Sequence, residues 1–298
     1  TVCGTSTCWW PGPRVRSGAT PLGPGHCVPY GDVLTPTGWC PIAEVRVGDK
    51  VASSDDSGNL DYVQVEQTFA HAYSGELVVY KARGVNIICT PEHQIARLGD
   101  RPSRHRGAPP ILSAVSDLPA TSHLITQFHW NCKPLDSYTV RPYPTKPRKL
   151  VQPMTIGGDD YCELMGWMVS EGYCTDRDKE FGIAQMKPLQ RTAIRSLLQR
   201  CGFLFREHVT GFNVAAADWW AEFRELGKCR DKFVPQVIKD APPSQLARFL
   251  WAAMQGDGCG NVYYTTSQRL ADYMMEVGLN LGFSPRLRER QRPDRVGL

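Results

Sequence analysis

The sequence predicts a multidomain protein in which an all-β domain is followed by an α+β domain. Short β-branched runs broken by glycine and aspartate begin after residue 26. Helical periodicity of apolar residues begins at Tyr161, and one helical segment then occurs twice, as in a domain built from two copies of one unit. A chain of 298 residues is long enough for two domains of ordinary size.

Composition and charge exclude some functional classes for this protein and permit others. Lys and Arg number 34 against 30 Asp and Glu, a net charge of +4 that permits nucleic-acid binding without requiring it. The cysteines number 11 and lack CxxC spacing, so they predict neither a disulfide framework nor a zinc site and favour the reducing cytoplasm. An apolar run of about 18 residues and a signal-peptide pattern are both missing, which argues against a membrane or secreted protein.

The β-rich region starts at Cys27 and extends over roughly 100 residues. Residues 1–26 before it contain several Pro and Gly residues without a periodic apolar pattern, so we interpret them as the end of another protein. The strands expected after Cys27 are short and β-branched, and they lie in the stretches 32–35, 42–51, 62–69 and 76–90.

Two basic stretches broken by proline or glycine follow, at residues 97–106 and 133–149. We expect no regular structure in them. Each is either a solvated surface loop or an arm along a phosphate backbone, and the sequence leaves both interpretations open. We treat residues 133–159 as a basic, proline-rich linker that also serves as a candidate DNA-contacting arm.

The repeated segment comprises residues 164–172 (LMGWMVSEG) and 250–258 (LWAAMQGDG). Each copy carries two small residues four positions apart, which gives each helix one flat face. We therefore expect the two helices to pack closely through these faces. The small residues are Gly166 with Ser170 and Ala252 with Gly256.

Each copy ends in an acid followed by glycine, Glu171 before Gly172 and Asp257 before Gly258. We expect each glycine to end its helix in the left-handed conformation, so that both acids meet at one end. A carboxylate there faces the negative end of the helix dipole, at a cost of about 0.3–1 kcal/mol, and a bound cation removes this penalty. Mg²⁺ accepts such carboxylates together with substrate phosphates, which predicts a metal-dependent nuclease centre. A solvated helix end is the alternative for one acid alone; the second copy favours the nuclease centre.

Both segments resemble the LAGLIDADG motif of homing endonucleases, with Glu171 and Asp257 at the positions of the metal-binding acids. Glu in place of Asp is a conservative departure. The resemblance implies two αββαββα repeats over residues 160–298, at 160–243 and 244–298, the second incomplete. It also implies a monomer that uses Mg²⁺ to cut double-stranded DNA.

The predicted elements follow that repeat order. The first copy continues with a hairpin at 172–186, a helix at 189–201, a hairpin at 203–215 and a helix at 217–226, and the second with strands at 261–266 and 286–292 around a helix at 268–281. By resemblance the strands enter the major groove of DNA. Basic residues of these hairpins are candidate contacts to phosphates or bases, although each alone fits an ordinary surface charge: Arg177, Lys179, Arg206, Arg286, Arg288 and Arg290.

The segment that begins at Cys27 (CVPYGDVLTPTG) resembles the opening block of inteins and of the wider Hint superfamily, and Thr90 to His93 (TPEH) resembles the TxxH block of that family. The resemblance implies a horseshoe-like all-β Hint domain over 27–132, with residues 1–26 as the N-extein of a host protein. The thiol of Cys27 would attack the carbonyl of His26 to give a thioester. By resemblance, His93 protonates the departing amide nitrogen and Thr90 polarises the amide.

Together the two resemblances imply a bifunctional intein, and we expect it to be truncated before the C-terminal splicing blocks. Splicing would need no cofactor. One alternative is a DNA-binding or maturase-like LAGLIDADG protein that has lost cleavage, which metal-dependent nicking of DNA would distinguish. Another is a Hint autoprocessing protein without nuclease activity, against which the second LAGLIDADG copy argues.

Overall fold

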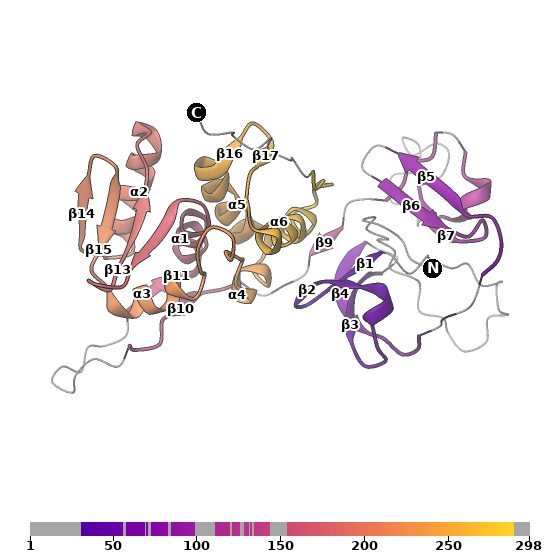
Figure 1. Cartoon of the computed structure of the whole chain (residues 1–298), viewed down its shortest axis with the longest axis horizontal. Coiled ribbons are helices and arrows are strands. Elements are labelled where there is room, and N and C mark those ends of the chain that lie inside the picture. Colours follow the sequence, from indigo (N-terminus) through magenta and orange to yellow (C-terminus); the bar gives the residue numbers. More distant parts are fainter. Residues whose placement is uncertain are drawn as a thin grey trace, which may run out of the picture. The chain divides into compact units, whose positions relative to one another are not determined.

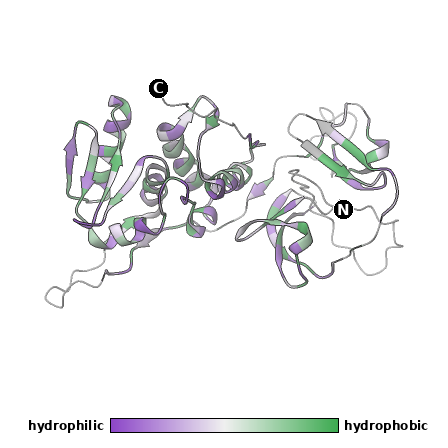
Figure 2. Ribbon diagram, viewed as in Figure 1, coloured by the Kyte–Doolittle hydropathy of each residue, from purple (hydrophilic) through white to green (hydrophobic). Residues whose placement is uncertain are grey.

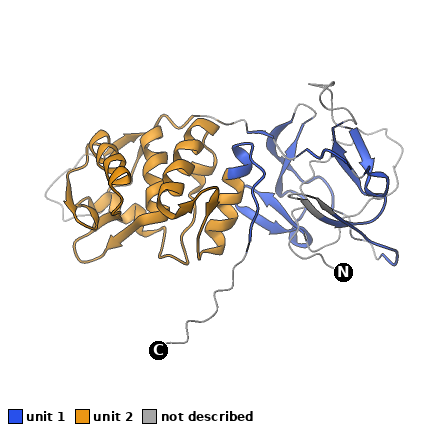
Figure 3. Ribbon diagram, turned by 90° about the horizontal axis from the view of Figure 1, so that it is seen from above, with its two compact units in different colours: residues 1–131, 278–298 blue, residues 132–277 orange. Residues whose placement is uncertain are grey.

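The computed structural model of the chain forms two compact units (Figure 1 and Figure 3). Unit 1 comprises residues 1–131 together with 278–298, and unit 2 comprises residues 132–277. The structure describes residues 31–55, 58–68, 70, 73–82, 85–98, 111–119, 121–125, 128–130, 132, 134–143 and 154–288.

Unit 1 is rich in short strands. In its described part before residue 131, the helical segments are two single 3-10 turns, η1 (Ile42–Glu44) and η2 (Val115–Asp117). The strands pair as β1–β2, β5–β6, β7–β8 and a three-stranded sheet β3–β4–β9, in which β9 runs parallel to β4. The strands expected at 32–35 and 76–90 are present, whereas the expectation for 42–51 is wrong for most of that stretch, because residues 42–44 form η1 and a strand begins at Lys50. The Hint fold stays a prediction. The strands are β1 (Asp32–Thr35), β2 (Gly38–Pro41), β3 (Lys50–Ser54), β4 (Asn59–Gln64), β5 (Val78–Ala82), β6 (Val85–Cys89), β7 (Gln94–Arg97), β8 (Ile111–Ala114) and β9 (His129–Trp130).

A small apolar core of unit 1 lies beside the turn between β6 and β7. Ile87, Cys89, Ile95 and Val115 are buried together, and partly buried residues of β5 pack against them. Alternate residues of β6 therefore point into this core, as expected for a strand with one buried face. The core holds in place the turn that follows Cys89.

Unit 2 contains the α-helices found among the described residues and a larger, four-stranded sheet (Figure 1). Its last helix, α6, continues into residues 278–280. The elements are β10 (Ser137–Thr139), β11 (Thr155–Gly157), α1 (Gly158–Glu171), β12 (Gly172–Thr175), β13 (Glu180–Ala184), α2 (Pro188–Arg200), β14 (Phe205–His208), β15 (Gly211–Val214), α3 (Ala217–Arg224), α4 (Gln236–Lys239), α5 (Pro243–Asp257), β16 (Gly258–Cys259), β17 (Val262–Tyr263) and α6 (Gln268–Asn280).

The elements of the predicted first repeat occur in the predicted order: α1, the hairpin β12–β13, α2, the hairpin β14–β15, and α3. The helices α2, α3 and α6 begin and end within two residues of the ranges expected from apolar spacing. Local periodicity was sufficient for these elements because each has one buried face and flanking Gly or Pro residues. The assignment of the whole unit to the LAGLIDADG fold remains a prediction.

The sheet of unit 2 has the strand order β12–β13–β15–β14, and all its pairs are antiparallel. Its inner face carries Phe181, Ile183, Phe212 and Val214, each at most 1% exposed, and α1 and α3 pack near it. The ring of Phe181 lies 4.8 Å from that of Phe223 in α3. The outer face is polar, so both hydrophobic and hydrophilic residues occur along these strands (Figure 2).

The predicted absence of regular structure in the basic stretch 133–149 is wrong for part of it, because β10 lies there. β10 pairs with β11, with Ser137 opposite Gly157. The backbone of Leu135 exchanges two hydrogen bonds with the side-chain amide of Gln245 in α5, at 2.9 and 2.8 Å. The basic and proline-rich composition predicted irregular structure. The pairing could not be predicted locally, because the partners of residues 135–139 lie far away in the chain.

The strand expected at residues 286–292 is also absent from its described part, which ends at residue 288. α6 ends before Gly282 (φ +77°), and the N–H of Phe283 donates to the carbonyl of Gly278 at 2.9 Å. Beyond this turn, residues 283–288 have no regular structure, and no described strand pairs with them. A strand needs a neighbour for its backbone groups, which sequence alternation alone does not supply.

Candidate functional site

Helices α1 and α5 pack side by side (Figure 1). A β-carbon at Gly166 would lie 2.7 Å from the Cβ of Ala252 and 3.0 Å from the backbone nitrogen of Ala253. A β-carbon at Gly256 would lie 2.7 Å from the Cβ of Ser170. Since real Cβ atoms do not approach so closely, both glycines are required at this interface. The small residues spaced four apart therefore meet across the two helices, as the sequence predicts.

Gly172 and Gly258 end α1 and α5, but the predicted left-handed conformation is wrong. Their backbone is extended, with φ −77° and ψ 146° at Gly172 and φ −92° and ψ 151° at Gly258, and it leads directly into β12 and β16. Glycine is needed for a different reason. A β-carbon would lie 2.5 Å from the Cα of Met168 in one case and 2.8 Å from the Cα of Met254 in the other. Each acid thus stands at the junction of a helix and a strand.

The two predicted metal-binding acids, Glu171 and Asp257, are half-buried and lie in each other's electrostatic field. Burial and then the charge of Asp257 raise the pKa of Glu171 above its ordinary value, and Lys187 and Lys232 oppose this rise. Burial likewise raises the pKa of Asp257, against the charges of Lys232 and Lys187. The structure therefore brings both acids and two lysines into one electrostatic cluster.

Lys232 connects this cluster to the end of α1. Its ammonium donates to the carbonyls of Met168 at 3.0 Å, Ser170 at 3.3 Å and Gly172 at 2.9 Å, so its three N–H groups match three acceptors. Only 7% of Lys232 is exposed, and burial lowers its pKa, whereas the neighbouring acids oppose that change. The hydroxyl of Ser267 donates to the carbonyl of Lys232 at 2.7 Å. A positive charge here stabilises the negative end of the helix dipole.

Gln185 contacts Glu171 directly. Its side-chain nitrogen donates to Oε1 of Glu171 at 3.5 Å, while its side-chain oxygen accepts the backbone N–H groups of Met186 and Lys187, each at 3.0 Å. The two backbone bonds orient the amide so that its N–H₂ group faces the acid. Gln185 is 5% exposed, which makes this orientation a fixed feature of the site.

Lys232, Gln185 and Lys187 were not predicted from the sequence. Lys232 precedes a short apolar segment between helices and is separated from Glu171 by about 60 residues of unrelated pattern. Gln185 and Lys187 follow β13 immediately before the helix-starting Pro188, where a polar residue is ordinary. No local signal distinguishes these side chains from surface residues, because only the packing of α1, α5 and the hairpin brings them together.

The donor atoms at this site are of the kind that Mg²⁺ accepts. Among the described residues, no group of three or more His, Cys, Asp or Glu side chains is arranged to hold a metal ion. Two carboxylates are enough when phosphate oxygens of a substrate and water complete the coordination. Glu171 and Asp257 thus fit Mg²⁺ bound together with a phosphate-bearing substrate.

The predicted DNA-contacting residues occupy different places. Arg206 lies in β14 on the outer face of the sheet, with 67% of its side chain exposed. Arg177 is exposed in the turn between β12 and β13, and in the same turn Lys179 (φ 50°) places its ammonium 4.4 Å above the ring of Tyr143. Three further candidates lie near the end of the chain: Arg286 and Arg288 are exposed in irregular structure, and Arg290 lies outside the described residues.

In unit 1, the predicted cleavage junction of His26 and Cys27 lies outside the described residues. Thr90 and His93 share the turn between β6 and β7, and the backbone N–H of His93 donates to the carbonyl of Thr90 at 3.1 Å. Thr90 is 2% exposed and His93 is half-buried. The structure therefore brings these two predicted residues together and leaves their relation to Cys27 undescribed.

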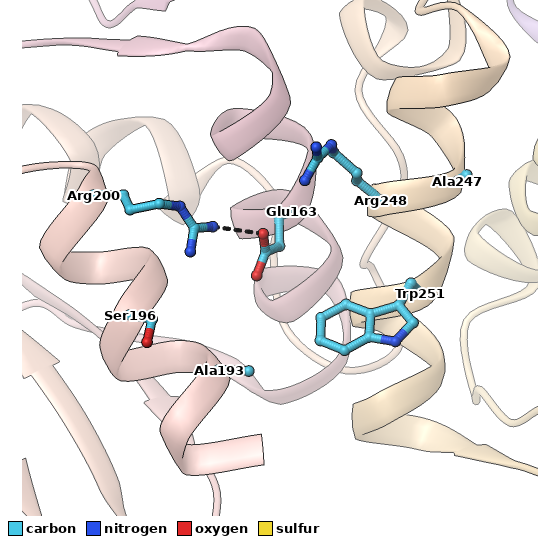
Figure 4. A pocket seen from close by; sticks show the side chains of 7 residues that line it. All are labelled: Glu163, Ala193, Ser196, Arg200, Ala247, Arg248 and Trp251. Atoms are coloured by element: carbon cyan, nitrogen blue, oxygen red, sulfur yellow. Dashed lines mark hydrogen bonds and ion pairs between the residues drawn. The ribbon is translucent and has the colours of Figure 1, made fainter. Parts of the chain in front are cut away.

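A groove on the helices of unit 2 is separate from the acid cluster (Figure 4). Within it, Arg200 donates to Glu163 at 2.8 Å, and the same guanidinium binds Asp160 at 2.9 Å. Neither Glu171 nor Asp257 lines it, so it is not the proposed reaction centre. Its lining residues are Glu163, Ala193, Ser196, Arg200, Ala247, Arg248 and Trp251.

Comparisons with known proteins give short local similarities. No family model matches the chain. The chain is 38% identical over 64 residues to the ATP-dependent Clp protease proteolytic subunit of Chlamydomonas moewusii, and 34% identical over 77 residues to an uncharacterised protein of Methanocaldococcus jannaschii. The matches cover 21% and 25% of this chain but 6% and 9% of those proteins, so the chain spans less than a tenth of the curated relatives it matches.

In the part of the chain that the structure describes, no helix combines the length and the hydropathy needed to cross a membrane.

Proposed function

We propose that unit 2 is a DNA endonuclease of the LAGLIDADG type and that Glu171 and Asp257 are its acidic residues. The observation that carries this proposal is the placement of the two acids at the ends of two helices packed through glycines, beside Lys232 and Gln185. Burial raises the pKa of both acids, and the charge of Asp257 raises that of Glu171 further, so two carboxylates are concentrated at one half-buried place. Such a concentration is unfavourable in the free protein and is relieved by a bound cation.

The residues of the centre have distinct roles in this proposal. The carboxylates of Glu171 and Asp257 would hold Mg²⁺, which supplies Lewis-acid stabilisation of the scissile phosphate and lowers the pKa of attacking water. Gln185 orients Glu171 through its amide hydrogen bond. Lys232 holds the end of α1 and offsets the negative charge of the acids. Because Lys232 makes three backbone hydrogen bonds, its first role is to position the acids.

Double-stranded DNA is the proposed substrate, bound along the outer face of the sheet β12–β13–β15–β14. This face is polar and carries Arg206, and Arg177 and Lys179 lie in the turn at one of its ends. We propose that the protein acts as a monomer, because one chain carries both acids. The odd number of cysteines and the lack of CxxC spacing favour the cytoplasm as its compartment.

For unit 1 we propose Hint chemistry at the junction of His26 and Cys27. The sulfur of Cys27 attacks the carbonyl carbon of His26, so that a C–S bond forms, the C–N bond breaks and the amide nitrogen gains a proton. His93 is the proposed proton donor, and Thr90 the group that polarises the amide. The proposal is supported by the two sequence blocks and by the shared turn of Thr90 and His93. The product is an N-extein thioester within a host protein.

Nicking of DNA tests the endonuclease proposal. The full chain is incubated with supercoiled plasmids carrying randomised inserts, in MgCl₂ or in EDTA, and nicked and linear products are quantified. We expect cleavage in MgCl₂ alone, and its loss by a factor of at least about 100 in Glu171→Gln and Asp257→Asn, since each removes a metal ligand. Asp160→Asn, at the opposite end of α1, should retain cleavage.

Two outcomes would count against this proposal. Cleavage that persists in both acid variants would exclude these residues as the centre. Tight binding of duplex DNA by the folded wild type without any cleavage would favour the alternative of a DNA-binding protein that has lost catalysis.

A further inference from the structure

The outer face of the sheet in unit 2 carries one continuous row of residues across all four strands. Tyr173 in β12 pairs with Gly182 in β13, Gly182 pairs with Asn213 in β15, and Asn213 pairs with Arg206 in β14. Because side chains alternate along a strand, Glu180 in β13 shares the face of Gly182. The row therefore contains an aromatic hydroxyl, a carboxamide, a carboxylate and a guanidinium on one surface.

Hydrogen bonds join these side chains into one network. The hydroxyl of Tyr173 donates to Oδ1 of Asn213 at 2.7 Å, and Nδ2 of Asn213 donates to Oε2 of Glu180 at 3.2 Å. The guanidinium of Arg206 binds the other carboxylate oxygen of Glu180. Tyr173 extends over Gly182, where a β-carbon would lie 2.5 Å from the phenolic oxygen. Glycine at that position thus allows the network to form.

The side chains of this network differ in how accessible they are to a ligand. Glu180 is 7% exposed, whereas 67% of the Arg206 side chain is exposed. The carboxylate of Glu180 is therefore buried beneath the surface of the sheet, and the guanidinium of Arg206 is the group that a ligand can reach. A buried carboxylate requires donors, and Arg206 and Asn213 supply them.

We propose that Glu180 is a specificity-determining residue. Its carboxylate positions Arg206 to bind the edge of a DNA base and opposes the binding of Arg206 to backbone phosphates, which occur in every sequence. This inference rests on the proposed DNA-cleaving function. A phosphate that binds Arg206 must compete with Glu180 for the guanidinium and also approach a negative charge. A guanine edge offers two neutral acceptors, and a guanidinium has five N–H donors, so Arg206 can bind guanine while it keeps its bond to Glu180.

The network also lowers the cost of recognition. An unpaired arginine loses side-chain freedom when it binds a base, and this loss weakens binding. Arg206 has lost much of that freedom already through Glu180, which Asn213 and Tyr173 hold in turn. Discrimination therefore arises from both the penalty on phosphate contact and the prior orientation of the guanidinium.

Salt-dependent binding to a non-cognate duplex tests this inference. The full-length Glu180→Gln variant keeps an acceptor for Arg206 and a similar shape but removes the negative charge. We expect it to bind a mixed-sequence 40-base-pair duplex more tightly than wild type at low salt. The slope of log affinity against log salt concentration should steepen by about 0.9, the value expected for one added phosphate contact. This corresponds to a loss of affinity between 50 and 200 mM salt that is about threefold larger than that of wild type.

Glu207→Gln is the matched control. Glu207 is the next residue of β14, on the face that carries Phe212 and Val214, where it pairs with Arg191 at 2.6 Å and Arg195 at 2.7 Å. The control changes net charge by the same amount and also releases arginines, yet it should leave the slope unchanged. In an Arg206→Gln background, Glu180→Gln should have no effect, because the released cation is absent.

The outcomes separate this inference from the proposed function. Equal steepening in the Glu180 and Glu207 variants would overturn it, since net charge alone would then explain the binding. Persistence of the Glu180→Gln effect without Arg206 would overturn it too. In either case the metal-dependent nicking assay tests the proposed nuclease activity independently of this inference. Absence of duplex binding by wild type and every variant would reject both the inference and the proposed function.

Discussion

At the residue scale, burial and the charge of Lys232 act in opposite directions on the ionisation of Glu171 and Asp257. The pKa of each acid is raised by burial, and Lys232 limits the rise in both. The direction matters for a metal site, because a protonated carboxylic acid is a poor ligand for Mg²⁺. Because the carboxyl pKa is raised, the two acids become protonated, and so lose the ability to bind Mg²⁺, at a higher pH than ordinary carboxylates do. Lys232 thus extends the range of pH over which both acids remain charged.

Replacing Lys232 with Met should shift the pH dependence of cleavage. Loss of the positive charge raises the pKa of both acids, so the acid limb of kcat/KM should move to higher pH. The matched control is Lys228→Met, an exposed lysine in the same loop, which should leave the limb in place. The profile is measured at saturating Mg²⁺ on the plasmid substrate. An unchanged limb in a folded Lys232→Met variant would remove Lys232 from the electrostatics of the centre.

The glycines after the acids show the limits of prediction for single residues. A glycine at the end of a helical pattern signals where the helix stops, and both helices do stop there. The conformation at that point was predicted incorrectly, because left-handed ends and direct entry into a strand share this signal. The close approach of the preceding turn, at Met168 and Met254, decides that glycine is required.

At the element scale, the pairing of α1 with α5 depends on Gly166. Alanine normally stabilises a helix relative to glycine, by about 0.5–1 kcal/mol. Here we expect the opposite sign, because the added methyl group meets the backbone of α5. Overpacking of this kind costs about 1–3 kcal/mol.

Urea unfolding of Gly166→Ala tests this sign. The variant should lose about 1–3 kcal/mol of unfolding free energy and, since the acids terminate these helices, part of its nuclease activity. Gly157→Ala is the control, because nothing lies within 4 Å of a β-carbon there and φ is −61°. It should stay within about 1 kcal/mol of wild-type stability, because the reduced flexibility of the unfolded chain offsets the weaker N-cap preference of alanine. A stabilised Gly166→Ala variant would contradict the tight α1–α5 interface.

Elements with one buried face were predicted well, whereas elements defined by distant partners were not. Apolar spacing and flanking Gly or Pro residues placed α2, α3 and α6 within two residues of their ends. The strands β10 and β11 were missed, since their stability depends on Gln245 and on stacking of Tyr138 against Tyr161 at 3.8 Å. The strand expected at 286–292 has no described partner to complete it.

At the scale of the whole molecule, the two units carry separate proposed chemistries. The residues proposed for splicing belong to unit 1, and the two acids belong to unit 2. We therefore expect variants of one centre to leave the other active. The test uses a reporter fused before Thr1 and intact mass after treatment with thiol. Release of a fragment ending at His26 should occur in wild type and Glu171→Gln and disappear in Cys27→Ala.

The reciprocal measurement is plasmid nicking, which Cys27→Ala should retain and Glu171→Gln should lose. Simultaneous loss of both activities in either variant, with folding intact by circular dichroism, would contradict two independent centres. Lack of thiol-dependent release from a folded wild-type fusion would reject the Hint chemistry proposed for this chain and leave the nuclease proposal standing.

The sequence by itself determined the repeated acids, the small-residue faces of the two helices and most of the elements between them. These features are local, because periodicity, glycine spacing and turn residues act over a few neighbouring positions. Only the tertiary structure decided that Lys232 and Gln185 join the acids, and that Glu180 holds Arg206 across the sheet. Such groupings depend on which elements pack and in which register, and hydrogen bonds between distant residues leave no periodic trace in a sequence.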